Sequence, residues 1–183
     1  MSFDALSRKT TSISPPYKRK IANDDAFWED SPFDWIRRLP SRTRGTIGQT
    51  LSRSVFDEYG YTATKRKDSF DAAGKRIISR WSMLWEDDHW KFQQIRNTAF
   101  DFLFCMGINP DNASAWLIPK EELYLNDGSL TERDGWDRQH GGKSGKEDAW
   151  LIVYPSDVPQ WLGKFGGDIS KISKVFTRLL SSS

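Results

Sequence analysis

The sequence predicts an α/β fold, with a mixed central sheet flanked by helices. Two segments repeat apolar residues at helical spacing, residues 41–59 and residues 169–180. Between them lie short runs rich in β-branched and aromatic residues, which are typical of strands. The chain has no internal repeat. A single sheet covered by these helices is therefore the expected architecture.

The first helical signal is Ser31 followed by Pro32, a favourable cap and first position, with an apolar face that ends before Pro40. The helix over residues 41–59 then ends at Gly60. A turn at residues 71–74 precedes a long strand. We expect strands or strand-like runs at residues 61–64, 75–85, 90–96, 100–108 (alternatively a short helix), 113–118 and 150–154, and a short helix at 119–122.

Length and composition indicate one globular domain, since the chain has 183 residues, of which 37% are hydrophobic and 28% charged. Residues 1–24 are basic and carry little apolar patterning, so we expect a mobile arm ahead of a single domain at residues 25–183. Within that domain, residues 126–148 are polar and glycine-rich, which predicts a long loop.

Several classes of protein are excluded by residue counts. A single cysteine, Cys105, forms no internal disulfide, and with only two histidines it leaves too few ligands for a closed structural zinc site. No apolar run approaches the roughly 20 residues of a membrane helix, and the N-terminus lacks the apolar stretch of a secretory signal. We therefore expect a cytoplasmic protein with no membrane partner.

The net charge of +2 is unevenly distributed along the chain. Residues 36–80 carry 11 basic and 4 acidic groups, whereas residues 81–183 carry 11 and 15. Clustered cations bind polyphosphates by releasing counterions, so we expect double-stranded DNA as a partner; a solvated, internally neutralised face is the alternative. The predicted DNA-binding residues are Arg37, Arg38, Arg42, Arg44, Arg53, Lys65, Arg66, Lys67, Lys75 and Arg76.

Other candidate motifs have simpler explanations. Gly-Gly-Lys-Ser at residues 141–144 lacks the earlier glycine of a phosphate-binding loop, because position 137 is Asp. His89 and His140 have no Cys or His companion at ligand spacing and are expected at the surface, and Cys105 is expected in the core. The nine tryptophans are best explained by core packing, although base stacking is an alternative for Trp81, Trp85 and Trp90.

Four segments together resemble the PD-(D/E)XK nuclease superfamily, the restriction endonuclease-like proteins. They are SPFDWIRRLPSRTRG at 31–45, WSMLWEDDHWKFQQIR at 81–96, GINPDNASAWLIPK at 107–120 and GGKSGKEDAWL at 141–151. The resemblance implies a restriction endonuclease-like fold, a Mg²⁺-dependent DNA phosphodiesterase in restriction or host defence, and a possible homodimer or partner subunit.

In that family, carboxylates hold Mg²⁺ against the scissile phosphate, and a lysine assists the attacking water. By position, Asp71 matches the family aspartate, with Asp68 as second choice, but Ile78 and Arg80 replace the Glu and Lys of the motif. Gln49 matches a first-helix glutamate. The resemblance thus implies catalytic residues Asp71, Arg80 and Gln94, and metal ligands Asp71, Asp68 and Glu86.

The two replacements leave three functional hypotheses. Isoleucine ligates no metal and arginine stays protonated, so either a displaced carboxylate such as Asp68, Glu86 or Asp88 restores the site, or the fold binds DNA without cutting it. The latter protein would be a non-catalytic binding or accessory subunit. A protein-interaction module, such as an immunity or anti-restriction factor, is the third hypothesis.

Overall fold

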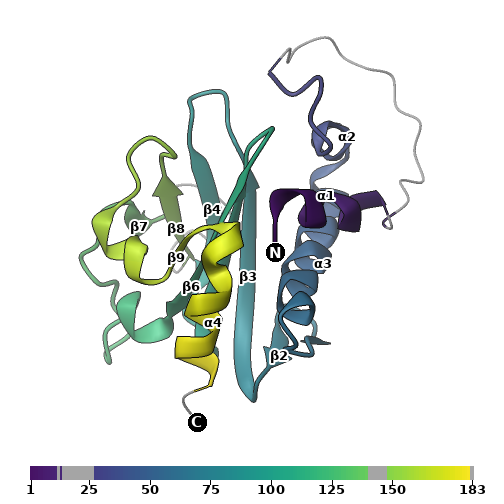
Figure 1. Cartoon of the computed structure of the whole chain (residues 1–183). Helices are drawn as coiled ribbons and strands as arrows, with labels where there is room; N and C mark the ends of the chain where they lie inside the picture. The colour runs from purple at the N-terminus through teal and green to yellow at the C-terminus, as the bar shows by residue number, and fades with distance from the viewer. Residues whose placement is uncertain (12, 14–26, 140–147, 182–183) are drawn as a thin grey trace.

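A computed structural model of the chain describes residues 1–11, 13, 27–139 and 148–181. In this part of the chain a six-stranded sheet lies between helices and a three-stranded sheet (Figure 1). The helices are α1 (Phe3–Thr11), α2 (Asp34–Arg37), α3 (Ser41–Glu58), α4 (Ile172–Leu180), and the 3-10 helices η1 (Lys120–Glu122), η2 (Gln160–Lys164) and η3 (Ile169–Lys171). The strands are β1 (Thr64–Lys65), β2 (Phe70–Ala72), β3 (Lys75–Met83), β4 (Trp90–Arg96), β5 (Phe102–Ile108), β6 (Ala113–Pro119), β7 (Trp136–Arg138), β8 (Asp148–Val153) and β9 (Gly166–Asp168).

The larger sheet is mixed, with the strand order β1-β2-β3-β5-β6-β9. Strands β3 and β5 run parallel, with Ile77 opposite Phe102 and Met83 opposite Ile108, and the other neighbours are antiparallel. Strand β5 is buried along its whole length, as expected where both faces of a sheet are covered. The predicted α/β class and mixed central sheet are confirmed.

The second sheet, β4-β8-β7, corrects the prediction of a single sheet. Strand β4 turns back over one face of the larger sheet, where Trp90 and Phe92 pack against Trp116 at ring-centroid distances of 5.7 and 6.3 Å. The indole of Trp90 lies so close to Gly107 that a Cβ there would be 2.4 Å from the ring. Alternating apolar residues of β4 therefore bury their face against the central sheet, so β4 does not extend that sheet at its edge.

Helices α3 and α4 cover the opposite face of the central sheet (Figure 1). The ring of Phe56 on α3 lies 4.9 Å from that of Phe70, 5.1 Å from that of Phe104, and 4.3 Å from that of Phe176 on α4. One aromatic side chain thus joins two helices to two strands, and such contacts exceed the energy of area burial alone. No helix in the described part of the chain combines the length and the apolar character needed to cross a membrane.

The N-terminal residues correct the prediction of an arm over residues 1–24. Helix α1 lies within that range, Leu6 is fully buried, and the ammonium of Lys9 lies 3.5 Å from the carboxylate of Glu58 at the end of α3. The helix was missed because one buried leucine in a short polar segment produces little periodicity. The remainder of the predicted arm, residues 14–24, lies outside the described residues.

The segment before α3 is less helical than predicted. Only the single turn α2 forms, and the Ser31 hydroxyl accepts a hydrogen bond of 3.2 Å from the Phe33 backbone N–H ahead of it. The predicted apolar face of Phe33, Ile36 and Leu39 is nevertheless buried. These contacts, and not a long helix, attach the segment to the domain.

The predicted glycine-rich loop is partly regular structure. Residues 136–138 form β7, and the buried Trp136 donates its indole N–H to the Leu123 carbonyl at 2.9 Å. The glycine-rich segment that includes His140 and residues 141–144 lies outside the described residues. Most of the other predicted elements are present in the structure. Residues 41–59 correspond to α3, 75–85 to β3, 90–96 to β4, 100–108 to β5, 113–118 to β6, 119–122 to η1, 150–154 to β8, and 169–180 to η3 with α4.

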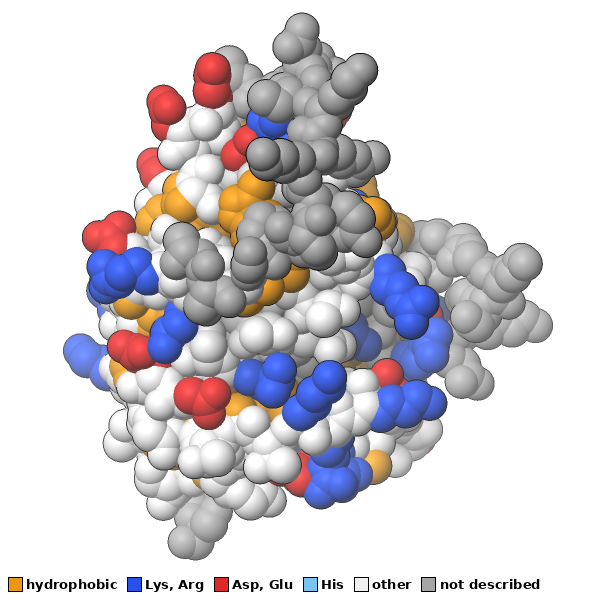
Figure 2. All heavy atoms as spheres, turned by 90° about the vertical axis from the view of Figure 1, so that its right-hand side faces the viewer, with side chains coloured by type: hydrophobic (Ala, Val, Ile, Leu, Met, Phe, Trp, Pro, Cys, Tyr) orange, Lys and Arg blue, Asp and Glu red, His pale blue; other side chains and the backbone are white. Residues whose placement is uncertain are grey.

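The uneven charge along the chain becomes an uneven charge in space. Residues 36–80, which carry the excess of cations, build α3 and strands β1 to β3 on one side of the molecule. Figure 2 shows several groups of Lys and Arg side chains on this side, with Asp and Glu side chains between them. The excess of cations in the sequence therefore belongs to elements that are neighbours in the fold.

We expect Gly48→Ala to destabilise the protein by about 1–3 kcal/mol, because overpacking a filled site forces neighbouring side chains to move. A Cβ at Gly48, on α3, would lie 1.9 Å from the indole nitrogen of Trp81 on β3. Urea unfolding followed by circular dichroism measures the change.

Gly45→Ala is the matched control, because a Cβ at this helical position meets nothing within 4 Å. It should stabilise the protein by about 0.5–1 kcal/mol through helix propensity. Equal effects of the two substitutions would contradict close packing of Trp81 on α3.

Candidate functional site

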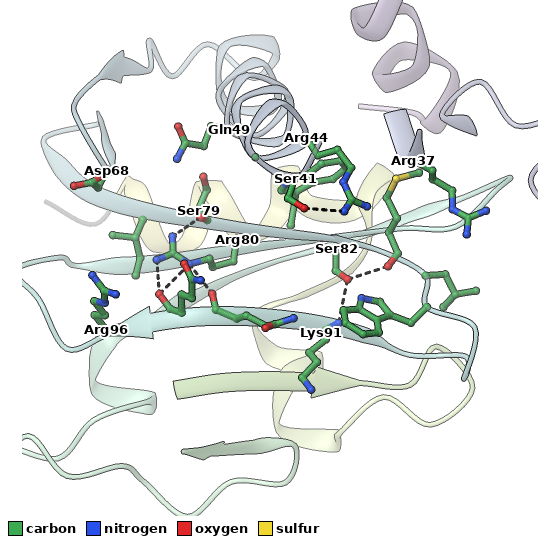
Figure 3. Close-up of a pocket in the computed structure, with 18 of the residues that line it drawn as sticks. Arg37, Ser41, Arg44, Gln49, Asp68, Ser79, Arg80, Ser82, Lys91 and Arg96 are labelled. Carbon is green, nitrogen blue, oxygen red and sulfur yellow. Dashed lines mark hydrogen bonds between the residues drawn. The ribbon is translucent and has the colours of Figure 1, made fainter. Parts of the chain in front are cut away.

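A cleft of about 1470 Å³ lies along the free edge of β3 (Figure 3). Strand β2 is short and pairs only with residues 75–77 of β3, so among the described residues no strand lies beside residues 78–83 on that side. Helix α3 forms one wall of the cleft and β4 forms the other. The cleft thus exists because one strand ends early between two layers.

Strand β3 forms the floor of the cleft, and its successive side chains point to opposite faces, as in any strand. Trp81 points to α3, where it packs on Gly48. Arg80 and Ser82 point to β4, where the Ser82 hydroxyl accepts a hydrogen bond of 3.1 Å from the Lys91 backbone N–H. One strand therefore positions both walls.

Arg80 joins β3 to β4 through its guanidinium group. Nε donates to the carbonyls of Gln93 at 2.9 Å and Gln94 at 3.2 Å, Nη2 donates to Gln94 at 2.6 Å, and Nη1 donates to the Ser79 carbonyl at 2.8 Å. Burial lowers the pKa of this guanidinium, but arginine stays protonated in proteins. The side chain predicted to contact phosphate is thus largely engaged by backbone carbonyls.

The carbonyls that Arg80 holds belong to a bulge in β4. The register of β4 against β8 shifts between Phe92 and Ile95, and Gln94 has a φ of +57°, which is unfavourable for a residue with a side chain. The Gln94 backbone N–H donates to Gln139 Oε1 at 2.8 Å. Gln94, predicted to position water, has its backbone fixed from two sides.

The cleft brings together most positions that the nuclease resemblance singled out. Gln49 from α3, Asp68 from the turn before β2, Ile78 and Arg80 from β3 and Gln94 from β4 all line it. Figure 3 shows Gln49, Asp68 and Arg80 toward the same end of the cleft. These positions therefore share one cleft, although their polar groups differ from those of the nuclease motif.

Asp71 is the predicted residue that the structure places elsewhere. It pairs with Arg66 and Arg76, and Arg66 Nε donates to its carboxylate at 2.5 Å. These three residues line a separate small pocket with Asp101. The hydrogen bond from Arg66 holds the pKa of Asp71 below its usual value. Asp71 is therefore not beside Arg80, and Asp68, the second choice, is the aspartate that lines the cleft.

The three predicted metal ligands do not form one cluster. Asp68 precedes Phe70, which pairs with Ile77 near the start of β3, whereas Glu86 follows the end of that strand. At about 3.3 Å per residue, the two carboxylates are separated by roughly 20 Å of strand, which is beyond the 2.0–2.6 Å reach of one shared cation. Among the described residues, no group of three His, Cys, Asp or Glu side chains is arranged to hold a metal ion. A magnesium site remains a prediction, and Asp68 is the predicted ligand that lines the same cleft as Arg80 near the start of β3.

The predicted DNA-binding residues lie in different parts of the structure. Arg37 and Arg44 line the cleft, and Arg42 and Arg53 lie on α3 in one stripe with the cleft residue Gln49. Arg38 pairs with Asp34. The remaining residues are at or near the β1–β2 edge of the sheet: Lys65, Arg66, Lys67, Lys75 and Arg76.

Two cations of the cleft were missed by the sequence prediction, Lys91 and Arg96 on β4. Arg96 pairs with Asp148 at 2.7 Å. The Lys91 ammonium lies 3.8 Å from the centre of the Trp150 ring and 5.7 Å from that of Trp85. Both lie outside the basic block of the sequence, and only the folding of β4 over β3 brings them to the cleft.

His89 corrects another prediction, because it is buried and not on the surface. Its relative exposure is 6%, and its ring is stacked on Trp85 at 5.6 Å with an angle of 23° between the planes. Its Nδ1 is 2.9 Å from an Asp87 carboxylate oxygen. Trp90 is buried, as core packing predicts, whereas Trp85 is 46% exposed and lines the cleft.

Comparison of the sequence with models of known protein families and with curated proteins finds no match.

We expect Arg80→Lys to destabilise the protein by about 1–3 kcal/mol, although lysine is the residue of the nuclease motif. A lysine has no planar fork of donors, so it cannot bond the carbonyls of Ser79, Gln93 and Gln94 at the same time. Urea unfolding measures the loss.

Arg53→Lys on α3 is the control for this exchange, since no ion pair or hydrogen bond of its side chain is found in the described residues. Its effect should stay within about 0.5 kcal/mol. Unchanged stability of Arg80→Lys would show that the guanidinium does not hold the bulge.

Proposed function

We propose that this chain binds double-stranded DNA along the cleft between α3 and β4 and does not hydrolyse it. The observation that carries the proposal is the set of five cations lining the cleft: Arg37, Arg44, Arg80, Lys91 and Arg96. Three carboxylates, Asp68, Glu86 and Asp87, also line it, and Arg96 is paired with Asp148, so the excess of positive charge is small. Cations that neutralise phosphates give affinity for any DNA sequence.

The size of the cleft supports a polymer as the ligand. The floor along β3 is roughly 20 Å long at about 3.3 Å per residue. One strand of DNA places a phosphate every 3.4 Å or so along the helix axis, so several consecutive phosphates match that length. The α3 stripe that includes Arg42 and Arg53 continues the positive surface along one wall.

The chemistry of the cleft supports binding without hydrolysis. Ile78 offers no oxygen at the motif position, and Arg80 accepts no proton from an attacking water. Arg80 is also engaged by the Ser79, Gln93 and Gln94 carbonyls. These residues supply neither the second carboxylate nor the base that metal-assisted hydrolysis uses.

A second candidate is Mg²⁺-dependent cleavage centred on Asp68. The observation that favours it is that three residues with oxygen-bearing side chains, Gln49, Asp68 and Gln94, line the same cleft as Arg80. Oxygen atoms are the ligands that Mg²⁺ prefers. A homodimer or partner subunit could complete such a site.

We expect duplex DNA to bind tightly at low salt and weakly at 200 mM salt, with a linear dependence of log K on log salt. Removing one phosphate contact by Arg44→Gln or Lys91→Gln should reduce the salt slope by about one each. Fluorescence anisotropy of a labelled duplex across a salt series measures both quantities.

Lys174→Gln is the matched control, because Lys174 is an exposed cation on α4 that does not line the cleft. It should leave the slope unchanged. No binding at low salt, or equal slopes for all variants, contradicts the proposed interface and favours a protein-interaction module.

We expect no nicking of supercoiled plasmid with Mg²⁺ or Mn²⁺, because Ile78 and Arg80 replace the groups that cleavage needs. Gel electrophoresis of the plasmid measures this. Metal-dependent nicking that disappears in Asp68→Ala and persists in Asp71→Ala overturns the non-hydrolytic proposal and supports the second candidate.

A further inference from the structure

Trp85 is a large aromatic side chain that lines the cleft and remains 46% exposed. Its ring is stacked on the ring of His89, with centroids 5.6 Å apart and 23° between the planes. Nearly half of the Trp85 residue stays accessible, although its ring is stacked on His89 and the Lys91 ammonium lies 5.7 Å from the ring centre. Trp85 therefore presents a flat apolar surface at the end of the cleft next to β4.

The position of the Trp85 ring is set before any ligand binds. The Trp85 backbone N–H donates to the His89 carbonyl at 3.0 Å, and the Asp88 N–H donates to the Trp85 carbonyl at 3.1 Å, which closes a tight turn. His89, beneath the ring, is buried and contacts Tyr154 on its other side at 5.5 Å. A preformed surface loses little entropy when a ligand stacks on it.

The charges around Trp85 indicate the chemical class of the ligand. The Lys91 ammonium lies 5.7 Å from the centre of the ring, the exposed Glu86 and Asp87 lie next to Trp85 in the lining, and the other cations of the cleft lie further along it. A neutral sugar would use the ring but not the cations, whereas a nucleotide uses both, since its base stacks and its phosphate attracts an ammonium group. The His89 ring is buried and stacked on Trp85, so it serves as a packing support for that ring.

We propose that Trp85 stacks against an unpaired base of DNA whose adjoining duplex lies in the cleft. Bases inside a duplex have both faces covered by their neighbours, so one tryptophan face accepts only a base at an overhang, or one turned out of the helix. The proposal rests on the proposed function, because the duplex part of the ligand occupies the same cleft. It adds a preference for junctions between duplex and single-stranded DNA.

The experiment compares a blunt duplex with the same duplex carrying a short overhang that includes 2-aminopurine. The wild-type protein should bind the overhang DNA about tenfold more tightly, and binding should quench the 2-aminopurine fluorescence. Trp85→Ala should lose the preference and the quenching but keep the affinity for blunt duplex and its salt slope. Trp85→Phe should retain most of the preference.

Tyr154→Ala is the matched control, because Tyr154 is 47% exposed and contacts His89 but does not line the cleft. It should keep the preference for the overhang. If Tyr154→Ala loses as much as Trp85→Ala, the effect comes from disturbed packing around His89, and the stacking proposal is overturned.

The outcomes separate this proposal from the proposed function. Salt-dependent binding of both DNAs with equal affinity overturns the stacking proposal and leaves DNA binding in place. Absence of binding to both DNAs at low salt overturns the proposed function and the stacking proposal with it. A preference for the overhang that Trp85→Ala retains overturns the stacking proposal alone.

Discussion

The link between Arg80 and the bulge of β4 is the interaction on which the cleft depends. It joins the central sheet to the second sheet at the point where Gln94 adopts a left-handed backbone conformation. Bulges re-aim the side chains around them, and this one lies within the wall that carries Lys91 and Arg96. The hydrogen bonds of the Arg80 guanidinium therefore join the two layers and set the shape of the cleft.

The opposite wall depends on a different contact, that of Trp81 with Gly48. Because glycine has no side chain, the indole rests directly on α3 and fixes the separation between helix and strand. Phe56 anchors the other end of the same helix to the sheet and to α4. The cleft is therefore held open by packing on one side and by hydrogen bonds on the other. Its positive charge is carried on rigid elements, which is what an interface with a polyphosphate requires.

Two residues have contacts in the structure that differ from the roles expected from the sequence. The nuclease resemblance implies a catalytic lysine at the position of Arg80, yet the donors of Arg80 contact backbone carbonyls. The resemblance also matches Asp71 to the family aspartate, but Asp71 forms ion pairs with Arg66 and Arg76 outside the cleft. Strand spacing alone does not distinguish Asp68 from Asp71, since the side of the sheet that each faces depends on where the β2–β3 hairpin begins.

The sequence by itself determined the main elements, the α/β class and the basic segment, because apolar periodicity and charge are local properties of the chain. Only the tertiary structure decided that β4 leaves the central sheet, that α1 packs on α3, and that Lys91 joins Arg44 at one cleft. These outcomes depend on contacts between residues distant in sequence, such as Trp90 with Trp116 and Trp81 with Gly48. Local patterns show which residues are buried, but the choice of partner is made by the packing of the whole chain.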